Sequence, residues 1–320
     1  MITAIVPAAV LTIYAIIAAV VLPRLLGEAK WADRAPRLAI AVWQAACASV
    51  IVSVLLAVFV LAVPAAVVGH GLAEFFAACE EMLTDGPDLI MATMGSGAAV
   101  AGALIVRVAW CAVSVLTGAR AERRRHAEML ALLGRHDGAL NAIVVDFDER
   151  LAYCVPGRRG RAVITTGALR DLSEEEAAAV LAHERAHLRG RHHLVLAFGE
   201  VLARAFPGVP LFERARTELA RLVELLADDL AARRHPRIVI AAALVRLATG
   251  RAPAFTLGAG GETALIRVRR MLTPEPPLDR RGRLTGALAV GLLLAGPAMV
   301  ALVPGLVSLL AHHCHELLFA

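Results

Sequence analysis

The chain has 320 residues and a mass of 33.7 kDa; 58% of its residues are hydrophobic and only 19% are charged. Soluble globular proteins are about 45–50% apolar and about 25% charged, so this composition excludes an ordinary water-soluble domain and a disordered chain. The net charge is +5. Membrane proteins keep their cytoplasmic loops basic, so the charge favours a membrane protein with no direct nucleic-acid partner.

Four apolar runs are long enough to cross the hydrocarbon core of a bilayer, which takes about 20 residues of helix. They lie at 2–22, 38–69, 89–119 and 284–311, and only Arg107 interrupts the third. No basic residue precedes the first run and no small-residue cleavage site follows it, so we expect a retained span and not a signal peptide. The sequence therefore predicts an α-helical membrane protein with four transmembrane helices.

Lysine and arginine residues set the expected orientation. The first loop and the segments next to the third and fourth runs are basic, whereas residues 70–88 contain acidic residues and no Lys or Arg. The positive-inside rule then places both termini outside a bacterial cell membrane. Cys79 and Cys314 would both lie outside, where a disulfide can form. The predicted organisation is three membrane helices in 1–119, a cytoplasmic domain in 120–283, and a fourth membrane helix with a short external tail in 284–320.

The cytoplasmic domain is predicted to begin with a small sheet. Residues 142–145, 151–155 and 162–165 are rich in β-branched side chains and are separated by Asp, Gly and Arg clusters. The last of these strands either forms an exposed edge for an extended peptide or lies inside the sheet. A helix follows, because Ser173 and Glu176 form a capping box before a run with helical periodicity. The inserted domain is therefore expected to be α+β and zincin-like.

This predicted helix contains the sequence His-Glu-Arg-Ala-His at positions 183–187. A spacing of four places His183 and His187 on one helix face, where both imidazoles can reach one tetrahedral Zn²⁺. Glu184 lies beside them and can act as the general base on a metal-bound water. A charged helix with two solvent-exposed histidines and no metal would have the same sequence pattern. The order of strand, cap and helix favours a zinc site.

A catalytic zinc normally has three protein ligands, and two residues compete for the third position. His193 would complete the longer motif H-E-x-x-H-x-x-G-x-x-H, but an apolar run follows it and no Met turn is evident. Glu224 lies on a second predicted helix, and Asp228 shares its face at i, i+4. We favour Glu224 as the ligand, with Asp228 accepting a hydrogen bond from a ligand histidine.

Four membrane helices, an H-E-x-x-H motif between the third and fourth, and a downstream E-x-x-A-D together resemble the integral-membrane gluzincins. The resemblance is greatest to the BlaR/MecR-type metallopeptidases and weaker to the HtpX-type proteases. It implies a membrane-embedded zinc endopeptidase with Glu184 as the catalytic residue and a BlaI-like transcriptional repressor as a substrate. The antibiotic-sensing members carry a penicillin-binding domain after the last span. This sequence ends nine residues after Ala311, so β-lactam sensing is not expected.

Two other functions would use the same residues. One is a receptor-like signalling protein with a non-catalytic zinc site. Structural zinc sites favour four ligands, commonly Cys, and have no need of Glu184, so the sequence argues against this function. The other is a protease for membrane-protein quality control, which shares the chemistry and differs in its substrate.

Overall fold

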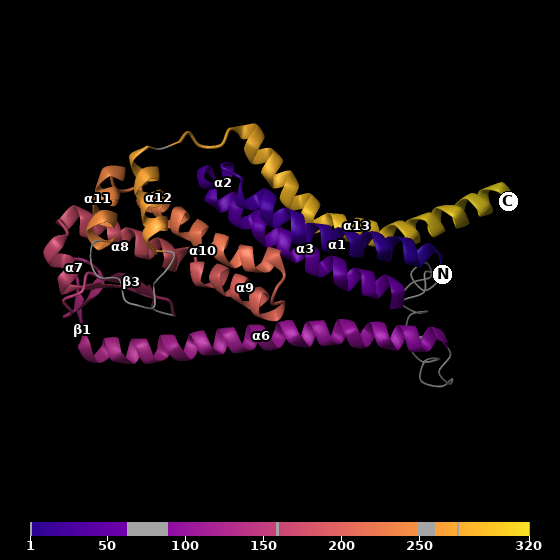
Figure 1. Ribbon diagram of the computed structural model, residues 1–320, viewed down its shortest axis with the longest axis horizontal. Coiled ribbons are helices and arrows are strands. Elements are labelled where there is room, and N and C mark those ends of the chain that lie inside the picture. Colours follow the sequence, from indigo (N-terminus) through magenta and orange to yellow (C-terminus); the bar gives the residue numbers. More distant parts are fainter. Residues whose placement is uncertain (1, 63–88, 158–159, 249–259, 274, 320) are drawn as a thin grey trace.

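The computed structural model describes residues 2–62, 89–157, 160–248, 260–273 and 275–319. The molecule is elongated, with a small sheet at one end and apolar helices extending away from it (Figure 1). The helices are α1 (Ile2–Gly27), α2 (Trp31–Arg34), α3 (Pro36–Ala62), α6 (Leu89–Leu133), α7 (Thr166–Asp171), α8 (Glu174–Arg189), α9 (His192–Ala205), α10 (Pro210–Ala231), α11 (Arg237–Ala248), α12 (Gly260–Leu272) and α13 (Arg280–Phe319). The strands are β1 (Gly134–Asp137), β2 (Ala142–Val145), β3 (Ala152–Val155) and β4 (Arg161–Thr165).

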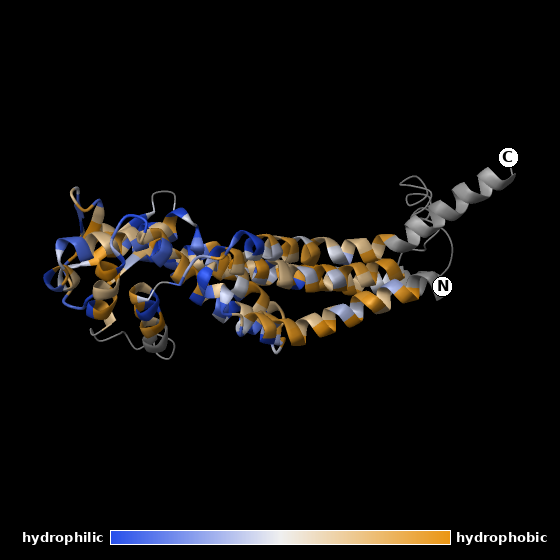
Figure 2. Cartoon of the chain, turned by 90° about the horizontal axis from the view of Figure 1, so that it is seen from above, coloured by the Kyte–Doolittle hydropathy of each residue, from blue (hydrophilic) through white to orange (hydrophobic). Residues whose placement is uncertain are grey.

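Within the described residues, α1, α3, α6 and α13 are long and apolar enough to cross a membrane. Figure 2 shows hydrophobic residues along this helical half and hydrophilic residues gathered at the sheet end. The composition thus agrees with a multi-pass membrane protein that carries a polar domain. Cys79 and the side chain of Cys314 lie outside the described part of the chain, so their disulfide stays a prediction.

The helices continue past the ends of the apolar runs. α6 covers the predicted boundary at 119/120, and α13 covers the one at 283/284. Residues 120–133 consist largely of Ala, Arg, Glu and Leu, which are good helix formers, and contain no Pro that would stop α6. Membrane helix and domain are therefore joined without a flexible linker at these two points.

The sheet has four strands in the order β1-β2-β4-β3. β2 and β4 are parallel, whereas the β1–β2 and β3–β4 pairs are antiparallel. The three predicted strands correspond to β2, β3 and β4; β1 is additional, and its sequence Gly-Arg-His-Asp has no β-branched residue that would have predicted it. β4 lies between β2 and β3, so the interior alternative for this strand is correct. The edge next to β4 is β3.

The sheet is covered on both faces, because successive side chains of a strand point to opposite sides. Ile164 of β4 packs with Val180 and Leu181 of α8 in one buried cluster. Val163, the preceding residue, packs instead with Leu130 of α6. The layers are therefore α6, sheet and α8.

The predicted capping box begins α8. The Ser173 hydroxyl accepts a hydrogen bond from the Glu176 backbone N–H at 3.2 Å, and the Glu176 carboxylate accepts one from the Ser173 N–H at 2.8 Å. These reciprocal bonds satisfy amide groups that have no partner inside the helix, and they fix where α8 starts. The start of α8 in turn sets which residues face the second helix of the site, α10.

The apolar face of α10 is buried against α1 and α3, two of the helices that are apolar enough to cross a membrane. Leu222 and Leu225 of α10 belong to one core cluster with Trp43 and Ala46 of α3 and with Ala18 of α1. Figure 1 shows α9 and α10 lying between the sheet end and this bundle. α1, α3 and the polar domain thus share a hydrophobic core.

Polar contacts tie the first loop to the same end of the molecule. Arg221 of α10 pairs with Asp33 of α2, and Arg270 of α12 donates to the Asp33 carbonyl at 2.9 Å. Arg34 donates to the carbonyl of Pro276 at 2.8 Å. The loop between α1 and α3 therefore lies on the same side of the apolar helices as the domain.

Arg107, which interrupts the third apolar run, also has a partner in this domain. Its Nε donates to the carbonyl oxygen of Ala205 at the end of α9. The last carbonyl groups of a helix have no partner inside it and carry a partial negative charge. The charge of Arg107 is thus compensated by a carbonyl group at the end of α9.

Candidate metal centre

Two histidines of α8 and one carboxylate of α10 converge on a single point. The Nε2 atoms of His183 and His187 are 3.0 Å apart. The two carboxylate oxygens of Glu224 each lie 3.4 Å from one of these nitrogens. One ligand atom from each of the three residues can be chosen so that all lie within 4.8 Å of one another. The structure therefore brings together three of the residues that the sequence singles out.

The spacing of these atoms fits a tetrahedral zinc ion. Zinc–nitrogen bonds of about 2.0–2.1 Å place two tetrahedral ligand atoms about 3.3 Å apart. The observed separations of 3.0, 3.4 and 3.4 Å are close to this value. Two imidazoles and one carboxylate are also a ligand set found in catalytic zinc sites, where a fourth position stays open for water.

Each histidine has a partner on its other ring nitrogen. The Nδ1 atom of His183 lies 2.9 Å from the carboxylate of Asp228, which is fully buried. The Nδ1 atom of His187 lies 2.9 Å from Nδ1 of His192, the first residue of α9. Such partners fix the orientation of a ligand imidazole and direct Nε2 toward the metal. The sequence predicts the role of Asp228 but gives no sign of that of His192.

Arg267 of α12 is a further member of the site that sequence reasoning missed. Its Nε and one Nη donate to the two oxygens of Asp228, both at 2.8 Å. Its other Nη lies 3.1 Å from the carboxylate of Glu224. Planar guanidinium groups suit this two-pronged contact with a carboxylate. Arg267 thus connects Glu224 to Asp228, the residue that contacts His183.

The electrostatics around His183 favour a positive charge, whereas burial lowers the pKa of His187 to about 4 and keeps that ring neutral. Burial alone would raise the pKa of Asp228, but hydrogen bonds from Arg267 and His183 outweigh it and hold that pKa well below its usual range. The same groups lower the pKa of Glu224 against the effect of burial. These two carboxylates raise the pKa of His183 although burial opposes this. A positive charge is stabilised here, and a metal ion can replace the proton.

Glu184 faces the edge strand of the sheet. Burial raises its pKa to about 7, while the charge of His183 opposes the shift. The nearby Cys154 thiol of β3 also opposes this rise. A carboxyl group with such a pKa can both take and release a proton near neutral pH.

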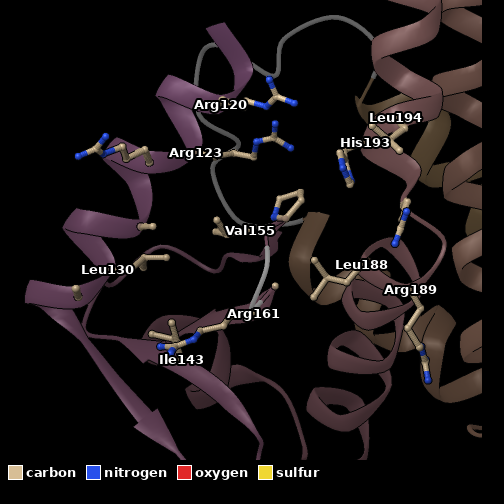
Figure 3. A pocket seen from close by; sticks show the side chains of 17 residues that line it. Arg120, Arg123, Leu130, Ile143, Val155, Arg161, Leu188, Arg189, His193 and Leu194 are labelled. Carbon is tan, nitrogen blue, oxygen red and sulfur yellow. The ribbon is translucent and has the colours of Figure 1, made fainter. Parts of the chain in front are cut away.

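His193 does not join this group. It lines a cavity between α6, the end of β3 and the start of α9, where Figure 3 shows it across from Arg120 and Arg123. Arg191 adopts a left-handed conformation with φ of 49°, and α9 begins directly after it. This turn brings His192 to His187 and directs His193 elsewhere. The structure thus places Glu224, and not His193, with the two histidines.

The capped H-E-x-x-H helix, the carboxylate from a second helix and the oriented imidazoles define a centre of the zinc metallopeptidase type. Comparison with family models gives the same class: residues 119–206 match the model described as Peptidase family M48. The matched segment includes α8 and α9 but ends before Glu224, Asp228 and Arg267. It supports a membrane-type metallopeptidase without distinguishing the BlaR/MecR type from the HtpX type. Comparisons with curated proteins and with solved structures give no significant match.

Proposed function

We propose that the chain is a membrane-embedded zinc endopeptidase that hydrolyses peptide bonds at the cytoplasmic face of a bacterial membrane. The observation that carries this proposal is the convergence of His183, His187 and Glu224 at zinc-like spacing, with Glu184 next to the first histidine. The match of residues 119–206 to a metallopeptidase family supports it.

Each residue of the metal centre has a separate role in the proposed hydrolysis. Zinc held by His183, His187 and Glu224 would supply an acidified water and a polarised peptide carbonyl. Glu184 accepts the proton of the attacking water and then donates it to the leaving amine. Asp228 and His192 hold the two imidazoles in place throughout.

The substrate is proposed to bind as an added strand on β3. β3 is an edge of the sheet and packs against α8, with Cys154 near Glu184, so a peptide along this edge would pass close to the proposed general base. Backbone hydrogen bonds would supply affinity that does not depend on the substrate sequence. This corrects the alternative in which β4 presents the edge, because β4 is paired on both sides.

Charge and contacts together support the proposed orientation in the membrane. The first loop carries basic residues and contacts the domain through Asp33 and Arg34, so both lie on one side. The positive-inside rule makes that side cytoplasmic. Reporter fusions after Arg37 and after Arg251 should both report a cytoplasmic location. An external signal at either position would contradict the orientation.

A BlaI-like repressor is proposed as the substrate on the strength of the sequence resemblance. Quality-control proteolysis of membrane proteins is the alternative. Proteomic comparison of cells that carry the wild type or Glu184→Gln will show which proteins gain a new N-terminus. Cleavage of a winged-helix repressor supports regulation, and cleavage of many unrelated membrane proteins supports quality control.

The peptidase proposal is tested with purified full-length protein. Glu184→Gln should keep its zinc content but lose activity by about 10²–10⁴-fold, the usual contribution of a general acid–base group. Glu175→Gln is the matched control, because Glu175 lies exposed in the first turn of the same helix. Cleavage by Glu184→Gln at the wild-type rate would refute the proposal.

A further inference from the structure

A large basic cavity lies next to the metal centre but contains none of its residues. Its volume is about 1050 Å³, and it opens between α6, the end of β3, the start of β4 and the junction of α8 and α9. Figure 3 shows Arg120 and Arg123 reaching into it from α6, opposite His193. Its apolar walls include Val155 and Leu188. A space of this size accommodates several residues of an extended chain.

Most of the positive charge of this cavity has no acidic partner among the described residues. No described acidic side chain lines the cavity, and of its arginines Arg124 pairs with a carboxylate, that of Glu128. The others make no ion pair within the described part of the chain: Arg120, Arg123, Arg161, Arg189 and Arg191. Other arginines of the domain do have carboxylate partners, as Arg221, Arg267 and Arg270 show. The pKa of His193 is lowered by burial and by the charges of Arg123 and Arg191. This positive potential therefore favours the binding of an anionic ligand.

The cavity begins where the edge strand passes Glu184. β3 packs against α8, and its Cys154 lies near Glu184, whereas Val155, the next residue of β3, already lines the cavity. Consecutive strand residues are about 3.3 Å apart, so a peptide along β3 moves from the reacting position into the cavity within a few residues. Acidic side chains of a peptide bound along β3 can therefore reach the cavity.

We propose that this cavity selects substrates that carry acidic side chains a few residues to one side of the cleaved bond. The inference rests on the proposed peptidase function and adds a substrate class to it. Antiparallel strand pairs outnumber parallel ones, and an antiparallel peptide would bring its N-terminal side to Val155. Acidic residues are therefore expected before the cleaved bond, within reach of Arg123 and Arg161.

An anionic lipid headgroup has the same chemistry and is the competing occupant. The cavity walls come from the end of β3, the start of β4, the α8–α9 junction and the polar part of α6, where Arg120 directly follows the apolar run 89–119. A headgroup could therefore reach the α6 side of the cavity. The other walls continue from β3, and this continuity favours a peptide.

The test uses full-length, zinc-loaded protein in detergent and pairs of peptides that differ only by Glu or Gln on the N-terminal side of the cleaved bond. Wild type should cleave the Glu peptide with a kcat/KM about fivefold higher, the size expected for one partly exposed ion pair. The ratio should approach one in the double variant Arg123→Gln with Arg161→Gln. Arg125→Gln is the control, because Arg125 is exposed on α6 and does not line the cavity. It should keep the wild-type ratio.

Binding of the same labelled peptides to Glu184→Gln supplies a readout that needs no turnover. The Glu peptide should bind more tightly than the Gln peptide, and salt and the double variant should both weaken this binding. Such a result supports selection of acidic peptides by the cavity even if no peptide is cleaved. Absence of cleavage would then refute only the peptidase function. Equal binding and equal cleavage of both peptides would overturn the proposal. So would displacement of the Glu peptide by phosphatidylglycerol vesicles but not by phosphatidylcholine vesicles, which would make the cavity a lipid site.

Discussion

The contact between Arg267 and Asp228 gives a prediction whose size can be worked out. Arg267→Gln removes two hydrogen bonds of 2.8 Å to Asp228 and a contact of 3.1 Å to Glu224. Removing one partner of a buried ion pair costs about 3–5 kcal/mol, because the remaining charge stays buried without compensation. His183 still contacts Asp228 at 2.9 Å, so the lower end, about 3 kcal/mol, is expected.

Thermal unfolding of zinc-free protein in detergent measures this loss. For a chain of this size 1 kcal/mol corresponds to about 2 °C, so Tm should fall by about 6 °C. Arg267→Lys should lie between the wild type and Arg267→Gln, since an ammonium group keeps the charge but cannot reproduce the planar fork. Arg269→Gln is the control, because Arg269 is exposed on the same helix. If Arg267→Gln and Arg269→Gln unfold at the same temperature, the buried pair does not stabilise the site.

Three further predictions concern the ligands and the shared core. His192→Ala should weaken zinc binding by about 10–100-fold in a chelator competition, whereas His193→Ala should leave it unchanged; equal effects would remove His192 from the site. Glu224→Ala should lower zinc affinity further than His192→Ala, because a ligand itself is lost; zinc retention at wild-type affinity would exclude Glu224 as a ligand. Trp43→Ala should destabilise the protein by about 3–5 kcal/mol, since Trp43 is 1% exposed, while Trp110, at 74% exposure, should tolerate the same change; similar losses would argue against the shared core.

The residues of the site that sequence reasoning finds are those with local signals. The capping box fixes the start of α8, and the spacing of four places His183 and His187 on one face. Glu224 and Asp228 are found by the same spacing on α10. These inferences need only helical geometry, which is why they require no knowledge of how α8 and α10 pack.

The residues that sequence reasoning misses depend on the packing of distant segments. Arg267 is 39 residues from Asp228 along the chain, and nothing in its neighbours separates it from the other arginines. His192 and His193 are adjacent, and only the left-handed backbone of Arg191 determines which of them meets His187. The free edge of β3 likewise depends on the parallel pairing of β2 with β4, which the strand sequences do not specify.

The shared core leads to a last prediction about the independence of the domain. Hydrophobic periodicity reveals that α10 has an apolar face but not that membrane helices cover it. Leu211, Leu219 and Leu222 are fully buried and belong to the cluster that α1 and α3 complete. A fragment of residues 120–283 would expose these side chains, at about 1.5–3 kcal/mol each.

We therefore expect the 120–283 fragment to aggregate or to bind zinc weakly, because the helix that carries Glu224 loses its cover. Fragment solubility and zinc affinity, compared with the full chain in detergent, check this expectation. A soluble monomer that binds zinc as the full chain does would show that α10 is held by the domain alone. Otherwise the position of Glu224 depends on how α1 and α3 pack, and any change in their packing reaches the metal centre through α10.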